Sequence, residues 1–264
     1  MKHLLKFSMP TLGLGLILLL GLAGAVIWMQ PGEASSELAC FALPDHQDLK
    51  QALTLARNEI NGGFNLDMWA TMVNRDGVVC AVAFTGRHRG DQWPGSRVIS
   101  AQKANTANAF SLPELALSTA NLFSAVQPGG SLYGLQHSNP VDTSVAYGGE
   151  SLFVGTSNDP MVGQKIGGVN VFGGGVPIYD RDGRLLGAIG VSGDSSCADH
   201  NIAWKTRTYL ELDYVPAGVS ATGDDNIVYD IGADGSASGW GHPACADVAT
   251  SVAEELPTTH PIGE

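Results

Sequence analysis

The sequence predicts an α+β fold in which one antiparallel sheet is flanked by helices. Two hairpin signals carry this prediction, because an Asp-Gly pair stands between apolar, strand-like runs at residues 76–77 and again at 182–183. Helical patterns lie before, between and after the hairpins, an order that favours strands and helices in separate layers. The 34 glycines indicate many turns and close backbone approaches rather than long helices.

The first predicted helix spans residues 45–60, where apolar residues recur at helical spacing. Asp45 is a candidate N-cap, and a Gly-Gly pair ends the pattern. Residues 68–73 and 78–84 then form the strands of the first hairpin. The domain therefore begins with a helix that is followed directly by two paired strands.

Two helices are predicted between the hairpins. An Ala-rich helix spans residues 96–110, and a shorter one over 115–125 begins after a Pro-Glu pair. The second hairpin pairs residues 176–179 with 185–191, and a Ser-Ser pair can cap the helix that follows over 198–212. This order supports a single sheet with helices packed on it.

A stretch rich in Gly, Ser and Pro, without periodicity, separates the two halves of the sequence at residues 127–168. A loop of this length is uncommon in a compact domain, and its aromatic and Leu residues indicate that it packs. We therefore expect one domain over residues 40–215 with an insertion at 127–168. Residues 216–250 are expected to be an extension packed on this domain, and 251–264 a mobile tail.

The N-terminus indicates export. Lys2, His3 and Lys6 precede an apolar run over residues 12–29, and small residues follow it, which is the order of a secretory signal. Residues 1–34 are therefore predicted to be a signal peptide or, if uncleaved, a membrane anchor, because the run approaches the length that spans a bilayer. We expect a periplasmic or secreted protein that contacts the inner membrane only through this segment.

The net charge and the spacing of the cysteines argue against several classes of ligand and partner. The chain has 26 acidic side chains against 14 lysines and arginines, a net charge of −12, and such a surface repels phosphate backbones. Nucleic acid is therefore not an expected partner. The four cysteines show neither CxxC nor CxxCH spacing, which argues against a zinc knuckle and against covalently attached haem. In an oxidising compartment they predict disulfides, with three connectivities open.

Familiar catalytic motifs are absent from the sequence. The run from Gly190 to Asp194 approaches a nucleophile elbow, but it ends in Asp where the motif has Gly, so a serine hydrolase is disfavoured. No Gly-rich phosphate loop follows a strand, and no HExxH pair is present. Neither a nucleotide site nor a dedicated zinc site is therefore indicated.

Two places carry side chains that could bind a ligand. Asp199 precedes His200 in the first turn of the last predicted helix, where a carboxylate could orient an imidazole ligand. Alternatively, Asp199 caps the helix and His200 faces solvent. Lys103 stands among alanines in the 96–110 helix. Its ammonium could hold a ligand carboxylate, or its stem could simply cover apolar surface.

Several motifs resemble the GlcG/HbpS family, which includes the C-terminal part of PduO-type proteins. The resemblance covers about residues 48–212, and the order and spacing of the motifs match. The matching runs are VNRDG at 73–77, SAQKANTA at 100–107 with Phe110, FGGGVPI at 172–178, and DGRLLGAIGVSG at 182–193, followed by Asp199 and Ala203.

This resemblance implies a profilin-like or PAS-like sheet flanked by helices, assembly into homo-oligomers, and binding of haem or a corrinoid-related ligand. We therefore expect a small planar ligand, haem first, between the Lys103 helix and the Gly-rich entry to the second hairpin. Lys103 would pair with a propionate, so Lys103→Ala should weaken binding and leave the fold intact, and His200 would bind the iron. The expected ligand set is Lys103, Thr106, Phe110, Gly174, Gly175, Asp199 and His200.

Other interpretations stay open. The chain could be a haem-degrading or small-acid-processing enzyme that uses Lys103 and Asp199 as acid and base, or a structural oligomeric accessory protein without a ligand. If the expected pocket fails, the 127–168 segment offers Tyr133, His137 and Tyr147 as substitutes.

The resemblance also favours one disulfide connectivity. Cys40 would pair with Cys80, because the return strand of the first hairpin packs near the first helix in the resembled fold. Cys197 would pair with Cys245 and link the C-terminal extension to the domain. Each bridge would contribute about 2–4 kcal/mol to stability.

Overall fold

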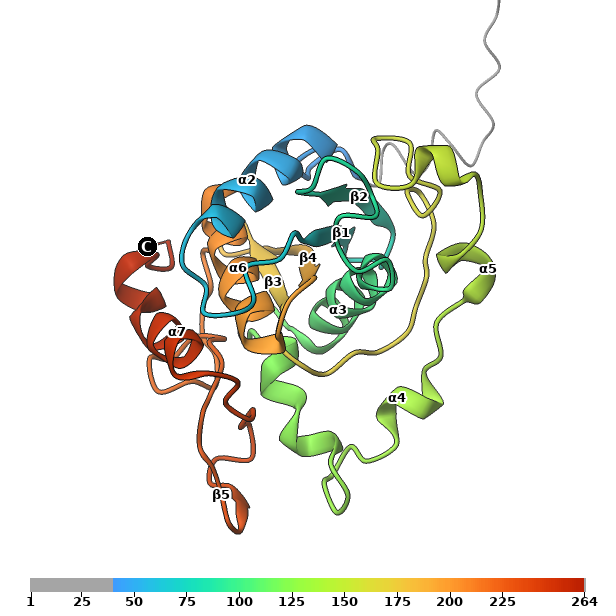
Figure 1. The fold of residues 1–264 in the computed structure, drawn as a ribbon. Helices are drawn as coiled ribbons and strands as arrows, with labels where there is room; N and C mark the ends of the chain where they lie inside the picture. The colour runs from blue at the N-terminus through green and yellow to red at the C-terminus, as the bar shows by residue number, and fades with distance from the viewer. Residues whose placement is uncertain (1–39, 264) are drawn as a thin grey trace, which may run out of the picture.

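The computed structural model of the protein describes residues 40–263. At its centre lies a four-stranded antiparallel sheet with the strand order β2-β1-β4-β3 (Figure 1). Each outer strand forms a hairpin with the inner strand beside it, and the inner strands pair with each other. The α+β architecture predicted from the sequence is therefore confirmed. The strands are β1 (Trp69–Asn74), β2 (Val79–Phe84), β3 (Gly175–Tyr179) and β4 (Leu185–Ser192).

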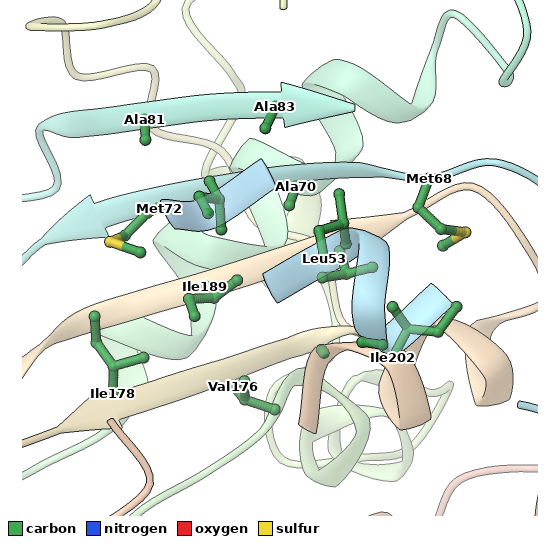
Figure 2. Close-up of a cluster of buried hydrophobic side chains, with 14 of the residues drawn as sticks. Leu53, Met68, Ala70, Met72, Ala81, Ala83, Val176, Ile178, Ile189 and Ile202 are labelled. Atoms are coloured by element: carbon green, nitrogen blue, oxygen red, sulfur yellow. The ribbon is translucent and has the colours of Figure 1, made fainter. Parts of the chain in front are cut away.

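Helices cover both faces of this sheet (Figure 1). α2 (His46–Asn58) and α6 (Ser196–Tyr209) pack on one face and against each other. Figure 2 shows Leu53 of α2 and Ile202 of α6 against the side chains of the sheet in the core between them. Asp45 caps α2 by accepting backbone N–H bonds, as the sequence predicts.

α3 (Ser96–Phe110) packs against the opposite face, and it comes unusually close to β4. A Cβ atom on Gly190 of β4 would be only 1.9 Å from the carbonyl oxygen of Ser100. The absence of that atom, together with alanines on the inner side of α3, lets the helix lie directly on the strand. This close packing fixes the position of the side chains that α3 carries.

The 127–168 segment packs around the α3 side of the sheet, as expected (Figure 1). Met161 and Ile166 are buried in the apolar cluster that α3 forms with the sheet. The backbone N–H of Gly163 donates to the carbonyl of Val79 at 2.8 Å, which joins the segment to the edge of β2. The segment contains α4 (Leu135–Ser138), α5 (Thr143–Ala146) and the short 3-10 helix η3 (Ser151–Phe153).

The prediction of an α-helix over residues 115–125 is wrong. Two short 3-10 helices stand there instead, η1 (Thr119–Leu122) and η2 (Ser124–Val126). Leu112 and Leu115 bond each other's backbone, and the N–H of Ala116 donates to Ala217, so these groups are not free to build an α-helix. Contacts with distant segments therefore override the local helical preference.

The C-terminal part of the chain packs beside α6 (Figure 1). It contains a small hairpin, β5 (Ile231–Gly232) with β6 (Gly235–Ser236), and α7 (Asp247–Thr259). Residues 251–259 thus belong to a helix, which corrects the expectation of a mobile tail from residue 251. Ala249, Ala253 and Leu256 recur at helical spacing and are buried, a pattern that could have indicated this helix.

Both predicted disulfides are confirmed: Cys40 is bonded to Cys80, and Cys197 to Cys245. The second bridge joins the first turn of α6 to the chain just before α7. None of the helices within residues 40–263 is long and apolar enough to cross a bilayer. The segment predicted to be a signal peptide or anchor lies outside the described residues.

Candidate functional site

Lys103 and Asp199 form a fully buried ion pair. The Lys103 ammonium donates to Asp199 Oδ2 at 2.7 Å and to the carbonyl oxygen of Val191 at 3.0 Å, and it lies 4.8 Å from the centre of the Phe172 ring. Burial lowers the pKa of Lys103. Burial also raises the pKa of the Asp199 carboxyl to about 6, against the opposing effect of the ammonium. The Lys103 ammonium thus already donates hydrogen bonds to two groups of the protein, the Asp199 carboxylate and the Val191 carbonyl.

The glycines at the entry to β3 serve the packing of the protein itself. Gly174 has φ +120°, and a Cβ on it would lie 2.3 Å from the carbonyl oxygen of Val191 and 2.8 Å from Lys103 Nζ. A Cβ on Gly175 would lie 2.5 Å from a methyl carbon of Thr119. In the described structure, protein atoms therefore fill the space where the sequence suggested a flat ligand.

His200 is buried beneath the C-terminal extension. Its Nε2 accepts a hydrogen bond from the backbone N–H of Ile227 at 3.1 Å and lies 3.2 Å from Asn226 Oδ1. Its Nδ1 has no partner among the described residues. Burial lowers the pKa of His200 to about 3, so the imidazole is neutral at pH 7.

The extension is held over these groups by several bonds. Arg207 forms a buried bidentate ion pair with Asp225, at 2.7 and 2.8 Å. The backbone N–H of Gly173 donates to His242 Nε2 at 3.3 Å, and burial lowers the pKa of His242 to about 4. We call Lys103, Asp199 and His200, together with this cover, the buried polar layer.

Thr106 and Phe110, the two other α3 residues of the predicted ligand set, lie on the outer side of the helix. The Thr106 hydroxyl donates to the carbonyl of Gln102 at 2.7 Å and accepts the N–H of Asn170 at 3.0 Å. Phe110 is half-buried against a separate apolar cluster that includes Leu117. The structure thus brings Lys103, Asp199 and His200 together, and it gives Thr106 and Phe110 other partners.

An open cavity lies at the N-terminal end of α3, between the loop before this helix and the 127–168 segment. Its volume is about 280 Å³. Four apolar residues contribute to its wall, two arginines and a serine supply polar groups, and the exposed Tyr147 completes its lining. We call it the Trp69 cavity; it is lined by Trp69, Arg89, Gly90, Pro94, Arg97, Val98, Tyr147, Ser151 and Val154.

Trp69 forms the floor of this cavity and is only 1% exposed. Its ring lies 5.0 Å from that of Phe84, tilted by 55°. A Cβ on Gly155, which has φ +76°, would lie 2.8 Å from Trp69 and 2.4 Å from Phe84, so only glycine lets the chain pass this close. The indole N–H has no acceptor among the described residues.

A buried ion pair holds the opposite wall. Arg97 of α3 donates from Nε to Asp159 Oδ2 at 2.8 Å, forms a second bond from Nη2 to Oδ1, and donates from Nη1 to the carbonyl of Ala146 at 2.8 Å. Asp159 also accepts the N–H groups of Gly155 and Met161, at 2.7 and 2.9 Å. One carboxylate thus ties the 127–168 segment to α3.

Tyr147 of this cavity is one of the substitute ligands expected from the sequence, whereas Trp69, Arg89 and Arg97 were not expected in a site. Trp69 and Arg97 lie inside predicted elements, where an apolar ring and a helical arginine have ordinary structural explanations. Their role in a cavity depends on the ion pair between Arg97 and Asp159, which lie 62 positions apart in the sequence.

A larger cavity of about 590 Å³ lies at the C-terminal end of α2. Its charged side chains already have partners within the protein: Arg57 donates to the carbonyl of Asn65 at 2.8 Å, Asp194 accepts the N–H of Phe64 at 2.8 Å, and Glu59 forms an ion pair with Lys205 at 3.0 Å. Its lining contains no His, Tyr, Met or Cys, the side chains that bind haem iron.

Comparison with known proteins gives one family and several related folds. The model of the family described as haem degrading protein, HbpS-like, matches residues 45–207. No curated protein matches the sequence. Among solved structures, the Klebsiella pneumoniae protein ORFY is 25% identical, with 62% of this chain and 86% of that chain covered and a TM-score of 0.42.

Two further structures are similar. The complex of PduOC with haem is 24% identical, with 65% of this chain and 96% of that chain covered and a TM-score of 0.45. A double mutant of Streptomyces reticuli HbpS is 17% identical, with 62% of this chain and 83% of that chain covered and a TM-score of 0.39.

Proposed function

The chain belongs to the family of HbpS-like haem-degrading proteins, and we propose that it is an exported protein that binds haem or a related planar tetrapyrrole in the Trp69 cavity. The observation that carries the proposal is the combination of residues around one opening. Apolar groups of Trp69, Val98 and Val154 stand beside the phenol of Tyr147. Tyrosine is one of the side chains that hold haem iron.

The residues of the Trp69 cavity fit such a group in chemistry, and the volume of the cavity admits one edge of it. A cavity of about 280 Å³ is at the lower end of ligand pockets, so it would take one part of a macrocycle and leave the rest exposed. Trp93 and Leu152 beside it are 52% and 79% exposed, which extends the apolar surface available to a flat ligand. Homo-oligomer formation, which would cover this surface, is part of the proposal.

Within this proposal, each side chain has a defined task. Trp69 and Val154 exclude water from one face of the ligand, and Tyr147 supplies an oxygen donor at the rim. When bound, haem would supply an iron centre. The Arg97–Asp159 ion pair keeps the two walls at a fixed separation, which orients the ligand without contacting it through the carboxylate.

The placement suggested by the sequence, with Lys103 at a propionate and His200 at the iron, stays a second prediction. It is favoured by one observation, the neutral His200 imidazole whose Nδ1 has no partner among the described residues. It requires that Asn226, Ile227 and His242 move away first, because they cover the imidazole and the neighbouring backbone. Acid–base catalysis by Lys103 and Asp199 would need the same opening.

Haemin titration tests both placements. We expect the purified protein to shift the Soret band of added haemin, and Tyr147→Phe to change the spectrum of the bound form. Tyr133→Phe is the matched control, because Tyr133 is also exposed in the 127–168 segment and does not line the cavity. A changed spectrum in His200→Ala with an unchanged one in Tyr147→Phe would move the site to the buried polar layer.

Export is proposed from the N-terminal sequence and the two disulfides. The order of basic, apolar and small residues over 1–34 favours translocation, and disulfides persist in oxidising compartments. Cell fractionation followed by thiol labelling would test it. Protein found in the cytoplasmic fraction with four reactive thiols would contradict the proposal.

A further inference from the structure

We propose that the Trp69 cavity contains a carboxylate subsite, in which the Trp69 indole N–H, the Arg89 and Arg97 guanidinium groups and the N-terminal end of α3 select ligands that carry a free carboxylate on an apolar, aromatic body. The inference rests on the proposed function only for the identity of that body, the tetrapyrrole. The subsite itself follows from the polar groups of the cavity.

The lining of the Trp69 cavity is rich in hydrogen-bond donors. Its polar side-chain groups are an indole N–H, two guanidinium groups and the hydroxyls of Tyr147 and Ser151, all of which can donate hydrogen bonds. Neither Asp nor Glu lines the cavity, although the whole chain has 26 acidic side chains and only 14 lysines and arginines. A concave surface made of donors matches a ligand group that only accepts.

The indole N–H of Trp69 has no hydrogen-bond partner in the protein as described. Trp69 is 1% exposed and lines the cavity, and its indole nitrogen is buried without an acceptor among the described residues, so a ligand acceptor reaches it when the neighbouring lining side chains shift. Buried donors without a partner are rare in native proteins because they lose their hydrogen bonds to water. An acceptor that arrives with the ligand explains why an indole, and not a plain aromatic ring, stands at this position.

The N-terminal end of α3 has no side-chain cap. This helix of 15 residues begins at Ser96 without a side-chain cap and without an acidic residue in its first turn, where Arg97 and Val98 line the cavity. The free N–H groups and the dipole at such an end attract anions. The missing cap at this helix and the unpartnered indole nearby are independent observations that favour the same kind of ligand.

The arginines retain donors for the ligand. The three bonds of Arg97 to Asp159 and Ala146 use one hydrogen each on Nε, Nη1 and Nη2, which leaves one N–H on each Nη atom. Arg89 is exposed on the facing loop, bonded to the carbonyl of Ser151. Asp159 neutralises Arg97 in part, so Arg89 and the helix end supply the remaining positive potential.

Iron-free protoporphyrin IX and its dimethyl ester separate carboxylate recognition from the iron ligand. Fluorescence titration should show the free acid binding at least about tenfold more tightly than the ester, as expected for hydrogen bonds to a charged group. Arg89→Gln and Trp69→Phe should each reduce the ratio of ester to acid dissociation constants several-fold. Arg87→Gln is the matched control: it removes the same charge from the same exposed loop, and Arg87 does not line the cavity.

Equal binding of acid and ester would overturn the carboxylate subsite and leave the proposed function standing. So would an acid preference that Arg87→Gln and Arg89→Gln reduce equally, because that result indicates general charge attraction. If neither porphyrin binds, the proposed function fails and benzoate decides the subsite. Benzoate binding by calorimetry that Arg89→Gln weakens and Arg87→Gln does not would support it, and absent benzoate binding would overturn it.

Discussion

Replacing Lys103 by Met is the sharpest test of the buried polar layer. Met retains most of the stem but removes the ammonium, so Asp199 loses its 2.7 Å partner while it stays only 1% exposed. Removing one member of a buried ion pair costs about 3–5 kcal/mol, a large part of the 5–15 kcal/mol that stabilise a typical domain. The sequence alone suggested that Lys103→Ala would spare the fold, and the buried pair reverses that expectation.

The pH dependence identifies the cause of the loss. In wild type, burial already raises the pKa of Asp199 to about 6, above its ordinary value of 3.8. An acid whose folded pKa is raised stabilises the fold below its unfolded pKa and loses this contribution as pH rises through the folded pKa. Without the ammonium the shift should be larger, so the deficit of Lys103→Met relative to wild type should be greatest at pH 7 and shrink toward pH 4.5.

Urea unfolding at both pH values measures these differences. The double variant Lys103→Met with Asp199→Asn is the matched control, because Asn still accepts the N–H of Asp194, which donates to Asp199 Oδ1 at 2.9 Å. It should lose less than about 2 kcal/mol at pH 7, since no uncompensated charge stays buried. A deficit of Lys103→Met below about 1 kcal/mol at pH 7, or one that is equal at the two pH values, would refute the reasoning.

Three further predictions concern the cover and the glycine beneath it. Replacing Cys197 and Cys245 by Ser opens a loop of 48 residues and should cost about 4 kcal/mol, with amide exchange rising most in residues 216–250; uniform exchange would contradict the link. Gly174→Ala places a Cβ 2.3 Å from the Val191 carbonyl at φ +120°, so thermal denaturation should show a loss of at least about 2 kcal/mol, and an unchanged Tm would be contrary evidence. His200, with its pKa lowered to about 3, contributes stability that is complete above pH 6.5 and falls by up to about 1.4 kcal/mol per pH unit below it; urea titrations of His200→Gln should show a smaller slope, because His242, with its pKa lowered to about 4, keeps its own contribution, and an unchanged slope would contradict the assignment.

Local features of the fold follow from neighbouring residues and could be predicted. The Asp45 cap, the two Asp-Gly hairpins and the limits of α3 all depend on backbone preferences within a few positions. The Cys40–Cys80 pair was also predicted, because the resemblance to a known family placed distant elements side by side, and the Cys197–Cys245 pair was predicted as the link between the last core helix and the C-terminal extension. The helix over 115–125 failed, since its backbone groups bond residues that lie far along the chain.

The candidate site likewise combines features that depend on neighbouring residues with features that depend on distant segments. The sequence by itself identified Lys103 as a cation in an otherwise small and apolar helix, and Asp199 with His200 as a carboxylate beside an imidazole at the start of another. Only the tertiary structure decided that they are covered, since the cover comes from Asn226 and Ile227, and that Arg97 meets Asp159 across 62 residues to form an open cavity above Trp69. Periodicity and turn chemistry act over a few residues, whereas burial and pairing of side chains depend on which remote segments pack together.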